Sequence, residues 1–477
     1  MPVAPPSDEA SLFYEGNRLL GAGDPAGAAG CYRQACARNP QFAEGWANLA
    51  LALERCGDAA GAEHAYRQAL ANGCSAMELH LNFGALLTAQ RRFDEALASY
   101  AQALRLDYSS AHLWSNLGAL YLGMQQDDDA LTCLERALQL KSDHASAQVN
   151  LAYLHLRHGH FARGWRALEG RNWYAAAADR LPCPRWRGEP LQGTSLLLLE
   201  EAGHGDVIQF VRYAAKLKAQ GVHHITLVCH ASLADLMQTA AGVDQVCSPD
   251  AALAHASFDY WSPLLSLPFH FETRADTIPA EIPYLQADPL LLAQWGARLH
   301  TADAWEPTRE RPLRVGLAWK GNPLFENDSQ RSIAHFELLA PLLAIPGVTF
   351  FSLQKGAGQD EPAELNARRA SQDLPAYPVT AFGEQLHSFA DTAAIVQQLD
   401  LVISVDTAVA HLAGALGVRC WVLLPDYMAD WRWGVNDTES AWYPGTMRLW
   451  RQSRGGDWPP LIASVAQTLH NLPRNPT

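Results

Sequence analysis

Acidic and histidine side chains follow an apolar stretch at residues 195–199, where the sequence continues EEAGHGDVIQF. Asp206 is placed at the carboxyl end of a predicted strand, where its carboxylate is a candidate general base. His204 is the second candidate base. Gly203 and Gly205 predict a tight turn that lets the backbone approach a ligand. The alternative is that Asp206 only caps the helix that follows.

A second group of polar residues ends the apolar stretch LVISV in LVISVDTAVAHLAGALG (401–417). Asp406 and Thr407 open a helix whose small residues, beginning with Ala408, allow close packing on a sheet. The free N–H groups and positive dipole end of such a helix suit a diphosphate. His411 lies one turn further. The alternatives are helix caps for Asp406 and Thr407 and a core position for His411.

A third group follows LRVGLAW (313–319), where a polar loop precedes a helix expected from about Ser332. Its candidate ligand-binding residues, with those that end the next apolar stretch, are Lys320, Asn322, Arg331, Gln354 and Lys355. Lysine and arginine beside a cleft suit a nucleotide diphosphate, although a solvated loop explains them equally well. Nearby aromatic residues either pack a core or line a donor pocket: Trp431, Trp433, Trp442 and Tyr443.

Short apolar runs alternate with helical patterns through the last two thirds of the chain. Strands are expected at 195–199, 225–229, 313–319, 348–354, 401–405 and 420–425, and helices at 207–221, 231–240, 332–345, 391–399 and 408–417. This alternation favours parallel sheets covered on both faces. A proline-rich stretch around 279–289 separates two such series, which predicts two doubly wound halves that bind ligand at the carboxyl ends of their strands.

The first third of the chain repeats every 34 residues. The repeated positions include Asn48, Asn82, Asn116 and Asn150, then Ala28, Ala62, Ala96 and Ala130, and also Tyr32, Tyr66 and Tyr100. One helical hairpin cannot bury its own apolar face, so several must stack. The asparagines either bind an extended peptide in a groove or bridge neighbouring hairpins. We therefore expect an array at 10–171, a linker at 172–194, and α/β halves at 195–290 and 305–477.

Composition restricts the classes of partner. The chain has 477 residues and a net charge of −14, and it lacks a lysine- or arginine-rich run, so nucleic acid and anionic membranes are not expected partners. No apolar stretch is long enough to cross a bilayer and no signal peptide is evident, which predicts a cytoplasmic protein. Nine cysteines without a C-x-x-C pair predict reduced thiols, and no metal site is expected.

The repeated columns resemble the tetratricopeptide repeat. The segment DTAVAHLAGALG resembles the signature of heptosyltransferase-like glycosyltransferases, whose GT-B architecture has two facing Rossmann-like halves. The Gly-His-Gly-Asp turn is similar to the turn that opens their N-terminal half. DYMADWRWG and AWYP look like a bacterial branch in which tetratricopeptide repeats precede such a domain.

The resemblance implies metal-independent sugar transfer from a nucleotide-diphosphate sugar, which is a substrate, so no separate cofactor is expected. Asp206 matches the position of the proposed base. The positions that match donor contacts are Asp406, Thr407, Ala408 and His411. Arg331 falls where the family carries a basic residue that holds the diphosphate. Because the array distinguishes this chain from lipopolysaccharide heptosyltransferases, the implied acceptor is a protein or peptide held in the groove, with flagellin as one candidate.

Two other functions remain open at this point. The chain is a non-catalytic adaptor with a degenerate nucleotide-binding domain, or it glycosylates a small molecule or lipid and uses the repeats for oligomerisation.

Overall fold

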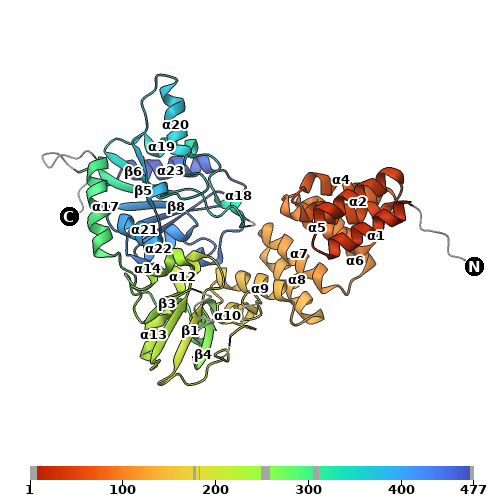
Figure 1. The fold of residues 1–477 in the computed structure, drawn as a ribbon, viewed down its shortest axis with the longest axis horizontal. Helices are drawn as coiled ribbons and strands as arrows, with labels where there is room; N and C mark the ends of the chain where they lie inside the picture. The colour runs from red at the N-terminus through yellow and green to blue at the C-terminus, as the bar shows by residue number, and fades with distance from the viewer. Residues whose placement is uncertain are drawn as a thin grey trace, which may run out of the picture. The chain divides into compact units, whose positions relative to one another are not determined.

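The computed structural model describes residues 8–175, 179–181, 183–248, 258–303, 311–325 and 327–472 (Figure 1). The chain forms two compact units, Met1–Leu151 and Ala152–Thr477. Parts of the expected linker, residues 176–178 and 182, lie outside the described residues. Each unit is considered separately below.

The first unit consists of antiparallel helical hairpins, and the last hairpin of the series continues into the second unit. The helices are α1 Asp8–Gly21, α2 Pro25–Arg38, α3 Ala43–Arg55, α4 Ala59–Ala71, α5 Met77–Ala89, α6 Phe93–Leu106, α7 Ala111–Gly123, α8 Asp127–Leu140, α9 Ala145–Arg157 and α10 Phe161–Leu168. Asp58 caps α4 by accepting a hydrogen bond from the Gly61 N–H at 2.9 Å. Arg91 adopts a positive φ of 60° in the turn before α6, where the repeat pattern predicts a turn.

Small residues on the first helix of a hairpin make room for large residues on the second. A Cβ atom built at Gly84 would lie 2.5 Å from Cε1 of Tyr100, and one at Gly16 would lie equally close to Tyr32. Tyr100 and Ala96 on the facing helix are buried. The repeated columns therefore encode the contact between the two helices of each hairpin.

Part of the asparagine column holds the hairpins together. The Asn48 side chain donates to Asn17 Oδ1 at 2.8 Å, and the Tyr32 hydroxyl donates to the same oxygen at 2.7 Å. Asn116 lies beside the Tyr100 hydroxyl. Asn48 thus bridges α3 to α1, which is the structural alternative for that position.

The second unit contains two parallel sheets among its described residues. Their strand orders are β3-β2-β1-β4 and β10-β9-β8-β5-β6-β7. The strands are β1 Ser195–Leu199, β2 His224–Val228, β3 Gln245–Cys247, β4 Tyr260–Pro263, β5 Leu313–Ala318, β6 Val348–Ser352, β7 Val379–Ala381, β8 Leu401–Val405, β9 Cys420–Leu424 and β10 Met447–Arg451. The order of connection reverses between β1 and β4 and between β5 and β8. Crevices at such reversals are the usual ligand sites of parallel sheets.

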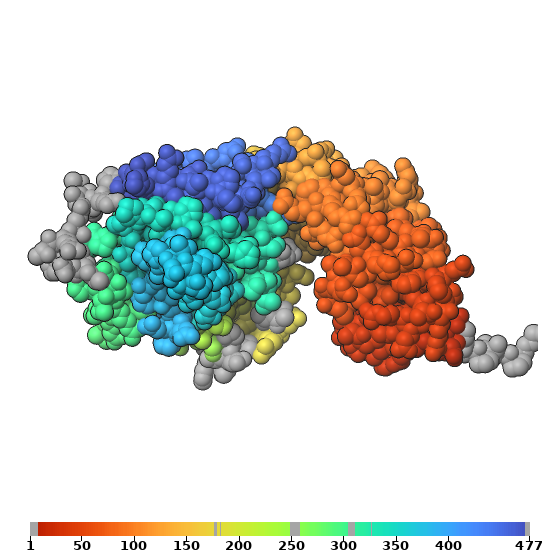
Figure 2. Space-filling model, turned by 90° about the horizontal axis from the view of Figure 1, so that it is seen from above, coloured from red at the N-terminus to blue at the C-terminus, as the bar shows by residue number. Residues whose placement is uncertain are grey.

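Helices cover the sheets of the second unit (Figure 1). They are α12 His204–Phe210, α13 Tyr213–Ala219, α14 Ala231–Met237, η1 Leu264–Ser266, α16 Leu267–His270, η2 Ala275–Thr277, α17 Pro289–Asp303, α18 Asp328–Arg331, η3 Phe336–Leu339, α19 Ala340–Leu343, α20 Glu361–Ala370, η4 Gly383–Gln385, α21 Phe389–Val396, α22 Ala408–Ala415, η5 Trp431–Trp433 and α23 Trp458–His470. One apolar cluster packs η3, α19 and α23 on the six-stranded sheet. Another joins α21 and α22 to α12, α14 and the four-stranded sheet, so both halves share a core. The α20 region stands out from this body and is prominent, in light blue, in Figure 2.

Two expected helices differ from the structure. The helix expected at 207–221 is two helices, α12 and α13, because side chains occupy the carbonyl groups at the break: Arg212 Nε donates to Gln209 O, and the Tyr284 hydroxyl donates to Ile208 O. The helix expected at 332–345 is the short pair η3 and α19, preceded by an extended Ser332. Pro341 lies in the first turn of α19, the part of a helix that tolerates proline. A continuous helix over 332–345 would place this proline in its interior.

The last hairpin packs into the α/β core of the second unit. Trp165 on α10 is buried, donates its indole N–H to Thr273 O at 2.9 Å, and lies edge-on to Trp431 with a centroid distance of 5.3 Å. Leu156 and Leu168 belong to the same apolar cluster as β1 and α22. These residues follow the repeat pattern but belong to the fold of the second unit.

Overpacking the α5–α6 contact is expected to destabilise the array. In Gly84→Val, the new side chain collides with Tyr100, so the free energy of unfolding should fall by about 1–3 kcal/mol. The matched control is Gly30→Ala within α2, where a Cβ atom meets nothing within 4 Å. Urea unfolding should show Gly30→Ala unchanged or stabilised by about 0.5–1 kcal/mol. Equal stability of the Gly84→Val variant and the parent would contradict the packing described.

Candidate functional site

The helices that follow β1 and β8 pack against each other, and this contact brings the ends of the two sheets together. A Cβ atom at Gly205 would lie 2.7 Å from Cδ2 of His411. The expected turn at Gly203-His204-Gly205 is the first turn of α12 itself: Gly203 is the N-cap with an ordinary φ of −81°, and the Asp206 N–H donates to Gly203 O at 3.0 Å. Gly205 is needed for the approach of α22 in this structure.

A buried ion pair holds the loop between β1 and α12. Arg171 donates to both carboxylate oxygens of Glu201, at 2.7 and 2.8 Å, and to Ser266 Oγ at 2.8 Å. The side chains of Arg171 and Glu201 are both fully buried. A bidentate pair fixes the relative position of its two side chains. Removing either partner would leave the other charge buried without compensation, which is strongly destabilising.

Asp206 lies in a network centred on Arg432, which follows β9. One carboxylate oxygen of Asp206 accepts the Gly203 N–H at 2.8 Å, and the other accepts from Arg432. Arg432 also donates to Asp430, at 3.0 and 3.1 Å, and to the Gln209 side chain. Burial raises the pKa of the Asp206 carboxyl, and Arg432 opposes that effect. Asp206 therefore both caps α12 and forms an ion pair across the two halves.

Asp406, which follows β8, and Arg331, at the end of α18, are further charged residues of this network. Burial raises the pKa of Asp406 to about 6; Asp430 adds to this effect, while Arg331 and Arg432 oppose it. Arg331 donates through Nε to Asp328 at 3.0 Å, and its guanidinium lies 4.3 Å from the Phe325 ring centroid. Its two terminal nitrogens make no hydrogen bond to a described residue, so Arg331 keeps a free guanidinium edge close to Asp406.

The amino end of α22 has no side-chain cap. The Thr407 hydroxyl lies 3.0 Å from Ser404 Oγ and makes no capping hydrogen bond. The expected alternative of a Thr407 cap is therefore not what the structure shows. Ala408 begins the helix and is half-buried. The helix retains an amino end of the kind that binds anions.

His411 is buried one turn into α22. Its Nδ1 lies 2.9 Å from the Tyr443 hydroxyl, and its ring stacks on Trp433 at 5.3 Å. Burial holds the pKa of His411 well below its usual value, and Arg432 and Arg212 act in the same direction. His411 is therefore neutral at physiological pH and occupies the core position named as its alternative.

Hydrogen-bond donors without a partner surround the network. The Gln209 amide nitrogen and the indole nitrogen of Trp431 are buried and make no hydrogen bond to any described residue. The Trp433 indole faces the Asp406 carboxylate and lowers its pKa by hydrogen bonding. Buried donors are normally satisfied, so unpaired ones close to the carboxyl ends of the strands indicate a place for a group that accepts hydrogen bonds.

His204 faces away from the Arg432 network. Its Nε2 lies 3.0 Å from Ser232 Oγ, and its ring lies 5.0 Å from the His230 ring. Burial lowers the pKa of His204, and His230 adds to this effect. Of the two candidate bases, the structure joins Asp206 to the other strand-end residues.

The remaining candidates from the loops after β5 and β6 make local contacts. Lys320 pairs with Glu361, and Lys355 donates to Leu386 O. The Gln354 amide oxygen accepts the backbone N–H groups of Trp319 and Lys320, at 3.1 and 3.0 Å. The Asn322 side chain accepts the Leu324 N–H at 3.0 Å. Gln354 holds the start of the loop that carries Arg331, Lys355 bonds to the segment before α21, and none of the four side chains has a hydrogen bond to Arg432 among the described residues.

Sequence reasoning missed Arg432, Asp430 and Gln209. The segment DYMADWRWG was interpreted through its aromatic residues, yet Trp431, Trp433, Trp442 and Tyr443 are almost fully buried core side chains. The available signal was position, since Asp430 and Arg432 follow the carboxyl end of β9 as Asp406 follows β8. Tyr153 on α9 was also missed; burial raises its pKa, and Asp430, Arg432 and Asp206 are its charged neighbours.

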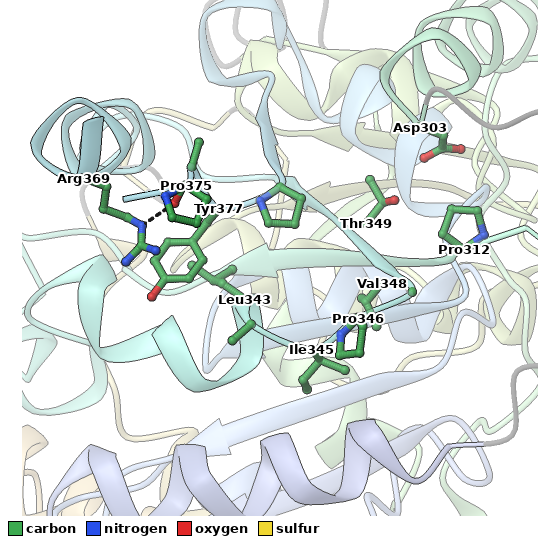
Figure 3. A pocket seen from close by; sticks show the side chains of 14 residues that line it. Asp303, Pro312, Leu343, Ile345, Pro346, Val348, Thr349, Arg369, Pro375 and Tyr377 are labelled. Atoms are coloured by element: carbon green, nitrogen blue, oxygen red, sulfur yellow. Dashed lines mark hydrogen bonds between the residues drawn. The ribbon is translucent and has the colours of Figure 1, made fainter. Parts of the chain in front are cut away.

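A hollow of about 550 Å³ lies at the amino ends of strands in the six-stranded sheet, away from the candidate site (Figure 3). It is lined by residues that precede β5, β6 and β7, among them Pro312, Pro346 and Pro378. In Figure 3, Arg369 donates to Pro375 O and lies over the Tyr377 ring, at 2.8 and 3.9 Å. This hollow is at the amino ends of the strands and contains none of the candidate residues.

Two kinds of feature are absent from the described part of the chain. No helix there combines the length and apolar character needed to cross a bilayer. No three histidine, cysteine, aspartate or glutamate side chains there converge as metal ligands.

Comparison with known families identifies the repeats. Residues 15–75 and 111–144 match tetratricopeptide-repeat models, and residues 84–125 match a TPR-repeat model. The N-terminal helices form a tetratricopeptide-repeat superhelix, and the rest of the chain is α/β with parallel sheets.

One curated relative is Protein FlbA of Caulobacter vibrioides, which is 28% identical over 336 residues. The match covers 66% of this chain and 53% of FlbA, so the chain spans about half the length of this relative. Because the helices of the array end at Leu168, a match of that extent must continue into the α/β part.

Solved structures resemble about one third of the chain. MamA from Desulfovibrio magneticus RS-1 is 19% identical, with a TM-score of 0.31, over 34% of this chain and 92% of MamA. PilF of Pseudomonas aeruginosa is 23% identical, with a TM-score of 0.31, over 34% of this chain and 75% of that protein.

Neutralising Asp406 is expected to stabilise the second unit in a pH-dependent way. Because the pKa of Asp406 is raised from 3.8 to about 6 in the folded state, folding favours the protonated form, so stability is lost as the pH rises between these two values and the full cost is present above about pH 6. Asp406→Asn should raise the free energy of unfolding by about 2 kcal/mol at pH 8 and by little at pH 4. Denaturant unfolding at both pH values measures the difference.

The matched control is Asp391→Asn. This buried carboxylate accepts hydrogen bonds from Trp295 Nε1, His387 N and Ser388 N, at 3.0, 2.9 and 3.1 Å. An amide there turns one acceptor into a donor and should destabilise the fold at pH 8 by about 1–3 kcal/mol. If Asp406→Asn behaved in the same way, the assignment of Asp406 as a costly buried charge would be wrong.

Proposed function

We propose that the chain is a glycosyltransferase that moves a sugar from a nucleotide-diphosphate donor to a hydroxyl acceptor. The observation that carries the proposal is the junction at α12 and α22, where Asp206, Asp406, Arg331 and Arg432 meet around buried unpaired donors. Two parallel sheets that face each other through their strand ends also fit the GT-B architecture implied by the resemblance of DTAVAHLAGALG.

The diphosphate is assigned to the side of the site formed by α22. The free edge of the Arg331 guanidinium and the uncapped amino end of α22 supply positive charge and N–H donors. Fixed donors of this kind stabilise the charge that develops on a leaving diphosphate without reorganisation. In the proposed metal-independent reaction, the Arg331 guanidinium and the amino end of α22 compensate the negative charge of the leaving diphosphate.

Asp206 is assigned as the general base. The acceptor oxygen attacks the anomeric carbon of the sugar, and its proton passes to the Asp206 carboxylate. The bond from that carbon to the diphosphate oxygen breaks, and the nucleoside diphosphate leaves with the bonding electrons. Asp206 lies on the half opposite the proposed donor site, which is the position required of a group that faces the acceptor.

A protein or peptide acceptor is assigned to the repeat array. Tetratricopeptide repeats match residues 15–75 and 84–144, and repeat arrays of this class present extended concave surfaces. Asn82 and Asn150 are half-buried members of the asparagine column for which the structure shows no bridging role like that of Asn48. They remain suited to binding a peptide backbone.

Donor binding and turnover test the catalytic proposal. Calorimetry of the full-length chain with UDP, GDP, CDP and ADP should reveal one that binds, and the matching sugar nucleotide should slowly release that diphosphate when water is the acceptor. Asp206→Asn should still bind it but release it about a hundredfold more slowly, because the base is removed.

Two results would count against this reaction. If none of the four diphosphates binds, the donor site is wrong and a non-catalytic adaptor becomes the better description. If Asp206→Asn turns over at the parental rate, Asp206 is not the base. The control is Arg311→Gln, which breaks the ion pair with Asp400 near the amino end of β5. This variant should bind and react normally.

Acceptor recruitment has a separate test in the intact chain. Replacing Asn82 and Asn150 with alanine should reduce modification of a protein acceptor, detected by intact mass, while release of diphosphate to water is unchanged. The expected reduction is about tenfold, the size of one or two lost hydrogen bonds. Unreduced protein modification in this variant would remove the asparagine column from acceptor binding.

A further inference from the structure

We propose that Arg432 is shared between the base and the donor: the diphosphate competes with Asp206 for its guanidinium, so donor binding releases the base. This inference rests on the proposed function and extends it to Arg432, which was not among the residues predicted to contact the donor. It follows from the contacts of Arg432, the charge balance of the network and the anchoring of Asp206.

Arg432 is placed to exchange one partner and keep the others. Its Nη1 bonds to Asp430 at 3.0 and 3.1 Å, its Nε bonds to Gln209, and its Nη2 bonds to Asp206. Trp431 and Phe210 lie 4.4 and 5.4 Å from its guanidinium carbon. With Nε and Nη1 held, only the Nη2 contact must change for a phosphate oxygen to replace a carboxylate oxygen.

The network as it stands is unfavourable for a diphosphate. The guanidinium groups of Arg331 and Arg432 are outnumbered by carboxylates, because Arg331 pairs with Asp328, Arg432 pairs with Asp206 and Asp430, and Asp406 lies near both. His411 is held neutral, and the Arg212 guanidinium, although charged, is engaged by the carbonyl groups of Pro279 and Trp442 and by the Tyr284 hydroxyl, so neither is placed to donate to a diphosphate. A ligand with at least two negative charges therefore needs a cation that is already paired.

Asp206 keeps its place when Arg432 changes partner. Its second oxygen accepts the Gly203 N–H at 2.8 Å as part of the capping box of α12. A neighbouring guanidinium stabilises an ionised carboxylate and weakens its affinity for a proton. Moving that charge to the diphosphate strengthens Asp206 as a base at the step where the acceptor must lose its proton. The exchange thereby couples donor binding to activation of the base.

The direction of one affinity change distinguishes this proposal from a structural role. The probe is whichever of UDP, GDP, CDP and ADP binds the full-length chain most tightly in calorimetry. Asp206→Asn removes the competing charge and keeps an oxygen for the Gly203 N–H, so it should bind the probe about three- to tenfold more tightly. Arg432→Gln should bind it at least about tenfold more weakly. If Asp206 only supported the fold of the site, its replacement would weaken binding.

Matched variants separate competition from simple repulsion and from misfolding. Asp391→Asn alters another capping box, one without an arginine partner, and should leave the affinity unchanged, as should Arg311→Gln. In an Arg432→Gln background, Asp206→Asn should no longer tighten binding. If tightening persists there, Asp206 acts by repulsion and the sharing proposal is overturned. Arg432→Lys, which keeps the charge, replaces Arg432→Gln if circular dichroism shows the latter unfolded, and should also bind more weakly.

The remaining outcomes assign failure to one proposal or the other. If no diphosphate binds the parent chain, the proposed function fails and this inference fails with it. If one binds and Asp206→Asn leaves its affinity unchanged or weaker, the donor site stands and the sharing of Arg432 is overturned.

Discussion

The packing of α12 against α22 places the carboxyl ends of two separate parallel sheets in contact. Each helix follows a strand next to the reversal in strand order of its own sheet, so each carries polar residues from a strand end. Gly205 allows the approach because any side chain there would collide with His411. The ion pair between Asp206 and Arg432, and the nearness of Asp406, exist only because this apolar contact brings the two halves together.

Charge buried at such a junction must be compensated locally. Arg171 pairs with Glu201 and Glu169, and Glu169 also pairs with Arg185, so this group of charges is balanced; Arg171 donates in addition to Leu168 O and Ser266, which fixes the loop before Asp206. The Arg432 network is less complete, since it keeps an excess carboxylate and unpaired donors such as the Gln209 amide. A complete network stabilises a fold, whereas an incomplete one retains affinity for a ligand.

The sequence identified the elements whose burial makes them apolar and continuous. β1 and β8 match the expected strands, and the other four central strands differ by a few terminal residues. The shorter strands β3 and β7 lie at sheet edges and lack an apolar run, so periodicity could not find them. β4 and β10 were also missed; YWSP ends in proline, and MRLWR alternates as an edge strand does.

The position of the candidate site was predictable from the sequence, whereas the hydrogen-bond and ion-pair partners of its residues were not. Asp206, Asp406 and Arg331 were predictable because each follows the carboxyl end of a strand, and the carboxyl ends of the strands in a parallel sheet lie along the same side. Position after a strand did not predict that Lys320 pairs with Glu361, or that Gln354 holds a loop through Trp319, since such pairings join residues distant in sequence. Arg432 was overlooked because the tryptophans on either side indicated packing.

The cost of the network bears on what it is for. Burial raises the pKa of Asp406 and of Asp206, so both carboxylates are kept under conditions that oppose their ionisation. Where packing alone matters, apolar residues of similar volume often stabilise such positions as well as a buried ion pair or better. Residues that break local rules of stability concentrate where a protein binds or reacts. The presence of these carboxylates at the α12–α22 junction therefore favours a bound ligand there over a purely structural α/β unit.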